Sequence, residues 1–104
     1  MNVAPGVAEI WLSRAAFTDL TEIDEYSAAQ FGDAAADAYK NGLDQAFTRL
    51  ASFPRSAEVR PAYGDGIRCL NYGRHRILYL IDGEIVQIVR VLHQAQDVLR
   101  NLAQ

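Results

Sequence analysis

Two long amphipathic stretches, separated only by Gly32 and Asp33, restrict the fold of this chain more than any other feature of its sequence. Apolar side chains recur every three or four positions in residues 13–31 and again in residues 35–53, which indicates two amphipathic helices. A two-residue connection forces the second helix to turn back beside the first. The sequence therefore predicts an antiparallel helical hairpin over residues 13–53.

The ends of both predicted helices carry recognisable signals. Ser13 is expected to cap the first helix, because its hydroxyl can accept an unpaired N–H of the first turn. Gly32 can adopt the left-handed backbone that closes this helix, and Asp33 is predicted to cap the second. Pro54 should end the second helix, because it forces the preceding Phe53 out of helical geometry.

The apolar stripes of the two helices are expected to face a common core, and the second stripe runs from Ala35 to Phe53. The side chains predicted to be largely buried are Phe17, Leu20, Ile23, Leu43, Phe47, Leu50 and Tyr79. Asp19, Glu22 and Glu25 lie on the other side of the first helix. They indicate a solvated acidic face rather than two carboxylates sharing a dry catalytic cleft.

The remainder of the chain predicts a β-sheet. Residues 8–12 are expected to form a short edge strand, and strand-like runs at 67–72, 75–81 and 85–92 follow a long loop over residues 55–66. Turn signals between these runs indicate an antiparallel meander, and the tail is weakly helical. We expect one α+β domain over residues 1–104. In it the N-terminal strand joins a mostly antiparallel sheet, the helical hairpin packs on that sheet, and the meander is its C-terminal part.

The last two predicted strands are apolar on both faces. Strict alternation along a strand places Ile77, Tyr79 and Ile81 opposite Leu78 and Leu80, and Ile85, Val89 and Val91 opposite Val86, Ile88 and Leu92. The helical hairpin can cover only one of the two faces, and the tail from Gln94 onward is too short to cover the whole of the other. A partner chain is expected there, since large apolar patches on soluble monomers usually mark interfaces.

Charge is distributed unevenly along the chain. The net charge is −3, but residues 1–53 carry eight acids against three bases, whereas residues 54–104 carry seven arginines against five acids. The acidic total argues against direct nucleic-acid binding, while the arginines suit carboxylates or phosphates. Arg90 interrupts an apolar strand, where an unpaired charge is costly. It therefore requires either an internal ion pair or an anionic group of a partner.

Little in the sequence indicates catalysis. Cys69 lies in a predicted strand, and neither His75 nor His93 is spaced to activate it. One cysteine and two scattered histidines argue against a metal site, and no catalytic residue or cofactor is expected. No apolar run of about 18 residues could cross a membrane, and residues 1–9 lack the basic and apolar regions of a secretory signal. A single cysteine fits a reducing, cytoplasmic compartment.

A series of short motifs runs in order from Leu12 to Asp97. It includes Leu12-Ser13-x-x-Ala16, Phe53-Pro54, Tyr72-Gly73-x-His75-x-Ile77-x-Tyr79, and Arg90-Val91-Leu92-His93 followed by Asp97. Together these motifs resemble the ParE-type toxins of the RelE/ParE superfamily of bacterial toxin–antitoxin modules. The resemblance implies the fold expected above and no enzymatic activity.

The resemblance also implies two protein partners. A cognate ParD-like antitoxin, encoded alongside, would wrap the toxin in a hetero-oligomer, and DNA gyrase would be the target whose inhibition stops growth. Candidate residues for binding the antitoxin or the target are Arg68, Arg74, Arg76, Arg90, His93 and Asp97.

Two alternatives remain open, namely a ribosome-dependent mRNA-cleaving toxin of the RelE type and a non-toxic interaction module. RNA cleavage needs a base, an acid and cations for the phosphate. Arg68 and Arg90 could match the cationic positions of the RNA-cleaving members, and His93 is the one candidate proton-transfer group near the C-terminus. No lysine follows Lys40 and no tyrosine follows His93, so the resemblance favours gyrase inhibition.

Overall fold

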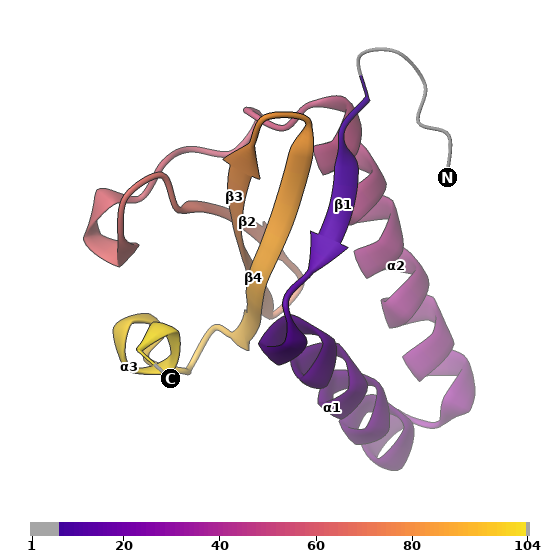
Figure 1. Cartoon of the computed structure of the whole chain (residues 1–104). Helices are drawn as coiled ribbons and strands as arrows, with labels where there is room; N and C mark the ends of the chain where they lie inside the picture. Colours follow the sequence, from indigo (N-terminus) through magenta and orange to yellow (C-terminus); the bar gives the residue numbers. More distant parts are fainter. Residues whose placement is uncertain (1–6, 104) are drawn as a thin grey trace.

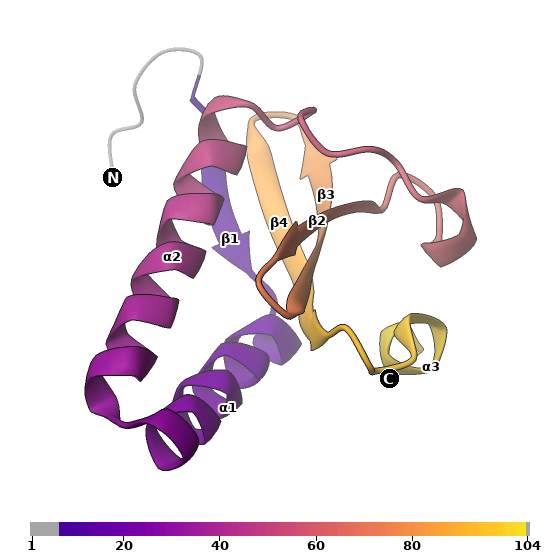
Figure 2. The ribbon, with the colours of Figure 1, turned by 180° about the vertical axis from the view of Figure 1, so that it is seen from behind.

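The helical hairpin and the sheet both form, and the hairpin covers one face of the sheet (Figures 1 and 2). The computed structural model describes residues 7–103; residues 1–6, most of the segment compared above with a secretory signal, and residue 104 lie outside the described residues. The elements are β1 (Glu9–Leu12), α1 (Arg14–Phe31), α2 (Asp33–Ser52), a short 3-10 turn η1 (Pro61–Tyr63), β2 (Arg68–Tyr72), β3 (His75–Asp82), β4 (Ile85–His93) and α3 (Val98–Leu102).

The sheet has four strands in the order β1-β4-β3-β2. The predicted meander of β2, β3 and β4 is confirmed as antiparallel, and β1 joins the sheet parallel to β4, with Glu9 opposite Ile85. The expected α+β class and the mostly antiparallel sheet are therefore confirmed. Within residues 7–103 no helix combines the length and apolar character needed to cross a membrane.

The hairpin begins at the predicted residue, but its junction differs by one position. Ser13 caps α1, because its Oγ accepts the Ala16 N–H at 3.0 Å. Gly32 has φ of +91° and is both the C-cap of α1 and the N-cap of α2. The prediction that Asp33 caps α2 is wrong, since the turn between the helices needs a positive φ at Gly32. Asp33 is already helical, in the first turn where a negative charge is favourable.

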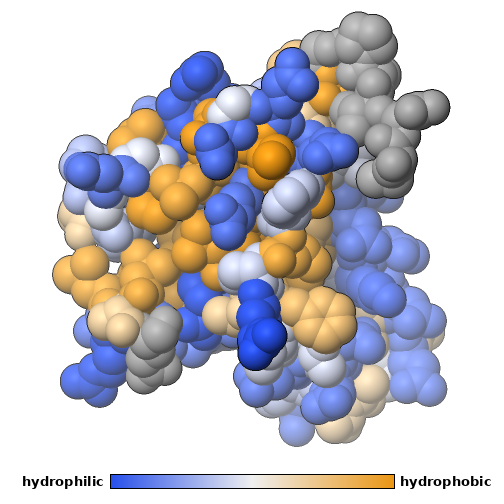
Figure 3. All heavy atoms as spheres, viewed as in Figure 1, coloured by the Kyte–Doolittle hydropathy of each residue, from blue (hydrophilic) through white to orange (hydrophobic). Residues whose placement is uncertain are grey.

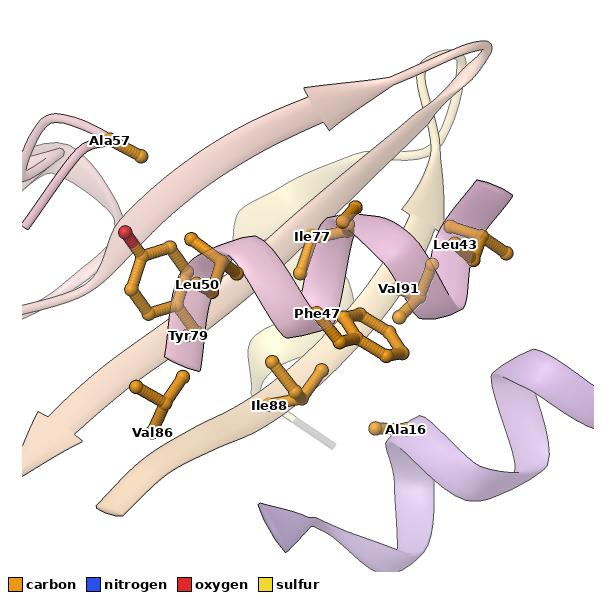
Figure 4. Packing of buried hydrophobic residues seen from close by; sticks show 11 residues of the cluster. Ala16, Leu43, Phe47, Leu50, Ala57, Ile77, Tyr79, Val86, Ile88 and Val91 are labelled. Atoms are coloured by element: carbon orange, nitrogen blue, oxygen red, sulfur yellow. The ribbon is translucent and has the colours of Figure 1, made fainter. Parts of the chain in front are cut away.

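The core lies between α2 and the sheet (Figure 4). Leu43, Phe47 and Leu50 of α2 are buried there as predicted, and so is Tyr79 of β3. The Tyr79 hydroxyl reaches the end of α2 and donates to the Pro54 carbonyl oxygen at 2.7 Å. Leu20 and Ile23 of α1 are half-buried against this core.

The burial of Phe17 was predicted wrongly, because its side chain is 63% exposed. Ala16 is instead fully buried, and its small side chain lets α1 lie close to the sheet. Consecutive helical residues point about 100° apart, so burial of Ala16 turns Phe17 toward solvent. The apolar stripe predicted for α2 was also wrong at both of its ends. Ala35 and Phe53 are exposed, and Ala36 is buried in place of Ala35.

A β-bulge in β4 changes which residues share a face. Leu78 pairs with Arg90 and Tyr79 with Ile88, so Val89 is an extra residue without a partner in the ladder. The bulge places Val86, Ile88 and Val91 together in the core on the hairpin side, and Val89 and Leu92 on the opposite side. The strict alternation assumed for this strand was therefore wrong beyond Ile88.

The face of the sheet away from the hairpin, here called the open face, is covered by the chain itself only in part. Leu78 and Leu92 are buried there beneath Val98 of α3 and Ile67. Apolar residues gather over the middle of this face in Figure 3. Its half-buried residues include Leu80 and Val89, and Trp11, which alternation places on this side of β1, is 56% exposed.

Candidate functional site

A groove of about 820 Å³ lies between the helical hairpin and the ends of β3 and β4. Glu22 and Tyr26 of α1 line one wall, His75 and His93 line the other, and Asn101 of α3 lies at the rim. The groove therefore lies where three separate parts of the chain meet, between acidic side chains of α1 and basic side chains of the sheet.

Three aromatic side chains of the groove contact one another. Tyr39 Oη lies 2.6 Å from His75 Nδ1, and the rings of His75 and His93, which are cross-strand partners, meet edge to face at 5.4 Å. The Arg74 N–H donates to Tyr39 Oη at 3.3 Å. Burial raises the pKa of Tyr39. Burial, helped by the neighbouring His93, lowers the pKa of His75, so His75 is neutral at neutral pH.

The second histidine of the groove is held by the backbone. His93 Nδ1 accepts the Ala95 N–H at 3.1 Å, which places the proton of the neutral ring on Nε2. The imidazole of His75 is likewise held at Nδ1 by Tyr39. The two rings are thus fixed by hydrogen bonds as well as by their mutual packing.

Two glycines allow the turn between β2 and β3 to lie against α2. A Cβ at Gly42 of α2 would lie 1.7 Å from Tyr72 Oη, and one at Gly73 would lie 2.6 Å from Tyr39 Oη. Gly73 also has φ of +54°, a backbone conformation that residues other than glycine adopt only with strain. The close approach of this turn to α2 therefore depends on glycine at both positions.

Asp19 and Arg90 form an ion pair at the edge of the groove. Arg90 Nε donates to Asp19 Oδ2 at 2.8 Å and Nη2 donates to Oδ1 at 2.9 Å, a bidentate geometry that raises the pKa of Arg90. The expectation that Asp19 belongs to a solvated face is therefore wrong, since this residue is only 8% exposed. Of the two alternatives for Arg90, the internal ion pair is confirmed.

This ion pair also completes the edge of β4. β1 pairs with β4 only as far as Ile88, and beyond that point α1 and its N-cap residue supply the partners. Ser13 Oγ donates to the Val89 carbonyl at 2.6 Å, and Asp19 Oδ2 accepts the Val91 N–H at 2.9 Å. Because buried backbone groups need partners, these two side chains replace the missing continuation of β1.

The predicted site residues do not form a single surface. Arg74, Arg90 and His93 line the groove, whereas Arg76 is half-buried and pairs with Leu92, whose side chain lies on the open face. Arg68 and Asp97 have internal partners. Arg68 Nη1 donates to the Ala57 carbonyl at 2.7 Å, and the Asp97 carboxylate caps α3 by accepting the Arg100 N–H at 3.1 Å.

The groove residues that the sequence did not single out as site residues include Asp19, Tyr39 and His75. The sequence indicated that Arg90 needed an anion, but its spacing could not identify Asp19, which is separated from it by 71 positions. Tyr39 was assigned only to an apolar stripe. Its pairing with His75 depends on the turn lying against α2, which local patterns do not report.

Cys69 and the potential metal ligands among residues 7–103 give no further site. Burial raises the pKa of the half-buried Cys69 thiol, and its Sγ lies 3.7 Å from Asn71 Oδ1. Within residues 7–103, no three histidine, cysteine, aspartate or glutamate side chains gather closely enough to hold a metal ion.

Comparisons with known proteins give a consistent family. A family model described as the ParE toxin of the type II toxin–antitoxin system parDE matches residues 10–98. Toxin ParE1 of Mycobacterium tuberculosis is 40% identical over 96 residues, which cover 88% of this chain and 94% of that protein. Toxin ParE1 of Caulobacter vibrioides is 32% identical over 91 residues, with the same coverage of each chain.

Solved structures share the fold at low sequence identity. A chain of the chromosomal ParDE toxin–antitoxin system from P. aeruginosa superposes with a TM-score of 0.72 at 19% identity, covering 85% of this chain and 97% of that one. A chain of the toxin–antitoxin complex RelBE2 from Mycobacterium tuberculosis gives 0.57 at 23% identity, with 84% and 98% covered. These similarities support the α+β fold described above.

Proposed function

Because the chain belongs to the ParE toxin family of type II toxin–antitoxin systems, we propose that it inhibits bacterial growth by binding DNA gyrase in the cytoplasm and is neutralised by a cognate ParD-like antitoxin. The membership confirms the resemblance found in the sequence. The inhibitory target, the neutralisation and the absence of enzymatic activity are the parts that we propose.

One observation carries the choice of binding over RNA cleavage. The two arginines compared above with the cationic positions of the RNA-cleaving members are both engaged within the fold, Arg90 by Asp19 and Arg68 by the Ala57 carbonyl. A phosphate in the transition state would have to compete with a bidentate carboxylate for Arg90. This occupancy supports a toxin that acts by binding.

One observation favours RNA cleavage as the second candidate. Tyr39, His75 and His93 bring three groups able to carry a proton to one groove, and acid–base catalysis needs such groups within reach of the substrate. However, His75 has a lowered pKa and its Nδ1 faces Tyr39. The cluster therefore supports a structural role of His75 more than proton donation.

A growth experiment separates the two candidates. Expression of the chain alone should stop growth, and His93→Gln should retain most of this effect if the protein acts by binding. If His93 is catalytic, His93→Gln should instead lower the activity about 10²-fold while the fold stays intact. Cleavage of mRNA in a translating extract, abolished by His93→Gln, would replace the gyrase proposal with RNA cleavage.

The open face supports the antitoxin part of the proposal. Its half-buried Leu80 and Val89 and its exposed Trp11 form an apolar surface, and Arg76 adds a cation. An antitoxin segment with apolar side chains and a carboxylate would fit this combination. We expect it to bind along the open face and to extend into the groove between the helical hairpin and the ends of β3 and β4. Stable interfaces of this kind bury about 1,200 Å² or more in total.

The antitoxin interface can be tested by charge reversal. Arg76→Glu should weaken the affinity for the product of the neighbouring gene at least about tenfold, because truncating or reversing a desolvated charge at an interface is costly. Arg49 is exposed on α2, away from the open face. The variant Arg49→Glu is therefore the matched control and should bind the antitoxin with unchanged affinity. Equal affinities of both variants, measured by calorimetry, would exclude Arg76 from the interface.

A further inference from the structure

The C-terminal helix α3 is held in place from outside itself. It spans only five residues, Val98–Leu102, and a helix of this length is not stable on its own in water. Val98 is buried in the open-face cluster at one end. Near the other end, Arg90 Nη1 donates to the Asn101 carbonyl at 2.7 Å. A cation at this end of a helix also interacts favourably with its dipole.

The position of this arginine depends in turn on α1. The Asp19 carboxylate accepts hydrogen bonds from Nε and Nη2 of Arg90. These bonds orient the planar guanidinium, so that Nη1 points at the Asn101 carbonyl. The same carboxylate is anchored by the Val91 N–H. A continuous set of hydrogen bonds therefore connects α1 to α3 through Asp19 and Arg90. The two helices come from opposite ends of the sequence (Figures 1 and 2).

The helix held in this way has an exposed surface of its own. Leu99 is 58% exposed and Arg100 is exposed beside it, while Asn101 forms part of the rim of the groove. A small apolar and cationic surface thus lies beside the groove, and its position is set by a side chain of α1.

We propose that Asp19 is a positioning residue, which acts through Arg90 to hold α3 so that Leu99 and Arg100 meet an apolar, acidic surface of the target protein. This inference rests on the proposed function for the identity of the target. The positioning itself depends only on the contacts within the chain.

Two substitutions test the positioning. Arg90→Lys keeps a cation for Asp19, but one ammonium group lacks the fork that serves the carboxylate and the Asn101 carbonyl together. Asp19→Asn keeps the shape of the side chain and an acceptor for Val91, and removes the charge. In both variants, hydrogen exchange at the Asn101 and Ala103 amides, which close α3, should become at least about tenfold faster.

The controls distinguish local release of α3 from general destabilisation. Exchange at the Ile81 and Val86 amides, which pair with each other in the sheet away from Arg90, should accelerate much less than exchange in α3. Glu25→Gln, which neutralises an exposed acid elsewhere on α1, should change neither region. Unchanged α3 exchange in a folded Arg90→Lys protein, or equal acceleration in the sheet and α3, would overturn the positioning role.

Inhibition of purified gyrase supplies the functional measurement. Arg90→Lys should raise the concentration needed for half-inhibition at least about tenfold, in line with the loss of a preorganised contact. Leu99→Ser should raise it similarly while leaving the exchange of the sheet unchanged. Faster α3 exchange with undiminished inhibition would overturn the link to the target. Failure of the unmodified protein to inhibit gyrase would refute the proposed function instead, and the exchange data would still decide the positioning role.

Discussion

Replacing Leu50 by alanine tests the arrangement of the helical hairpin directly. Leu50 is fully buried between α2 and the sheet (Figure 4). The substitution removes three carbon atoms, which at about 0.8 kcal/mol each corresponds to roughly 2.4 kcal/mol of lost burial. The surrounding side chains belong to a rigid helix and sheet and cannot fill the space, so a cavity cost adds to this. We expect a total loss of about 3 to 5 kcal/mol.

Phe17→Ala provides the matched comparison. The sequence predicted both side chains to be buried, whereas Phe17 is 63% exposed, and its truncation should cost less than about 1 kcal/mol. Urea unfolding followed by circular dichroism measures both. In a separate thermal unfolding experiment on a chain of this size, Leu50→Ala should lower the melting temperature by about 12 to 30 °C. A cost for Phe17→Ala equal to or larger than that for Leu50→Ala would show that the orientation assigned to α1 is wrong.

Two further predictions concern the groove. Gly42→Ala should destabilise the protein by about 1 to 3 kcal/mol although alanine favours helices, because its Cβ would overlap Tyr72; Asn41→Ala, at an exposed position of the same helix, should be neutral or stabilising. Burial and His93 lower the pKa of His75 in the folded state, so the unfolded chain takes up this proton first and stability should fall as the pH drops through about 6.5. Urea midpoints at several pH values should show a shallower dependence for His75→Gln, and an unchanged slope would refute this assignment.

The elements that the sequence predicted correctly are those with a strong local pattern. Helical periodicity, the Ser13 hydroxyl and the turn between β3 and β4 each act within a few residues, so the hairpin and the meander could be recognised without tertiary information. The turn itself lies at Gly83-Glu84, one residue later than the Asp82-Gly83 pair that the sequence favours, because Asp82 still pairs with Ile85. The parallel pairing of β1 with β4 joins the two ends of the chain. Its direction was not predicted, although its place in the sheet was.

The features that the sequence did not reveal are set by tertiary contacts. The bulge at Val89 shifts the alternation of β4 by one residue, and nothing in an apolar run of this kind marks where such a shift occurs. The rotation of α1 follows from the close approach of Ala16 to the sheet, which also brings Asp19 to Arg90. A periodic pattern shows that a helix has an apolar face, but it defines the direction of that face only to within about one residue.

The supercoiling activity of purified DNA gyrase tests the central claim most directly. With relaxed plasmid and ATP, the purified chain should block supercoiling and cause cleaved DNA to accumulate, and the cognate antitoxin should restore activity when it is added first. Undiminished supercoiling at a large molar excess of correctly folded protein would contradict the account.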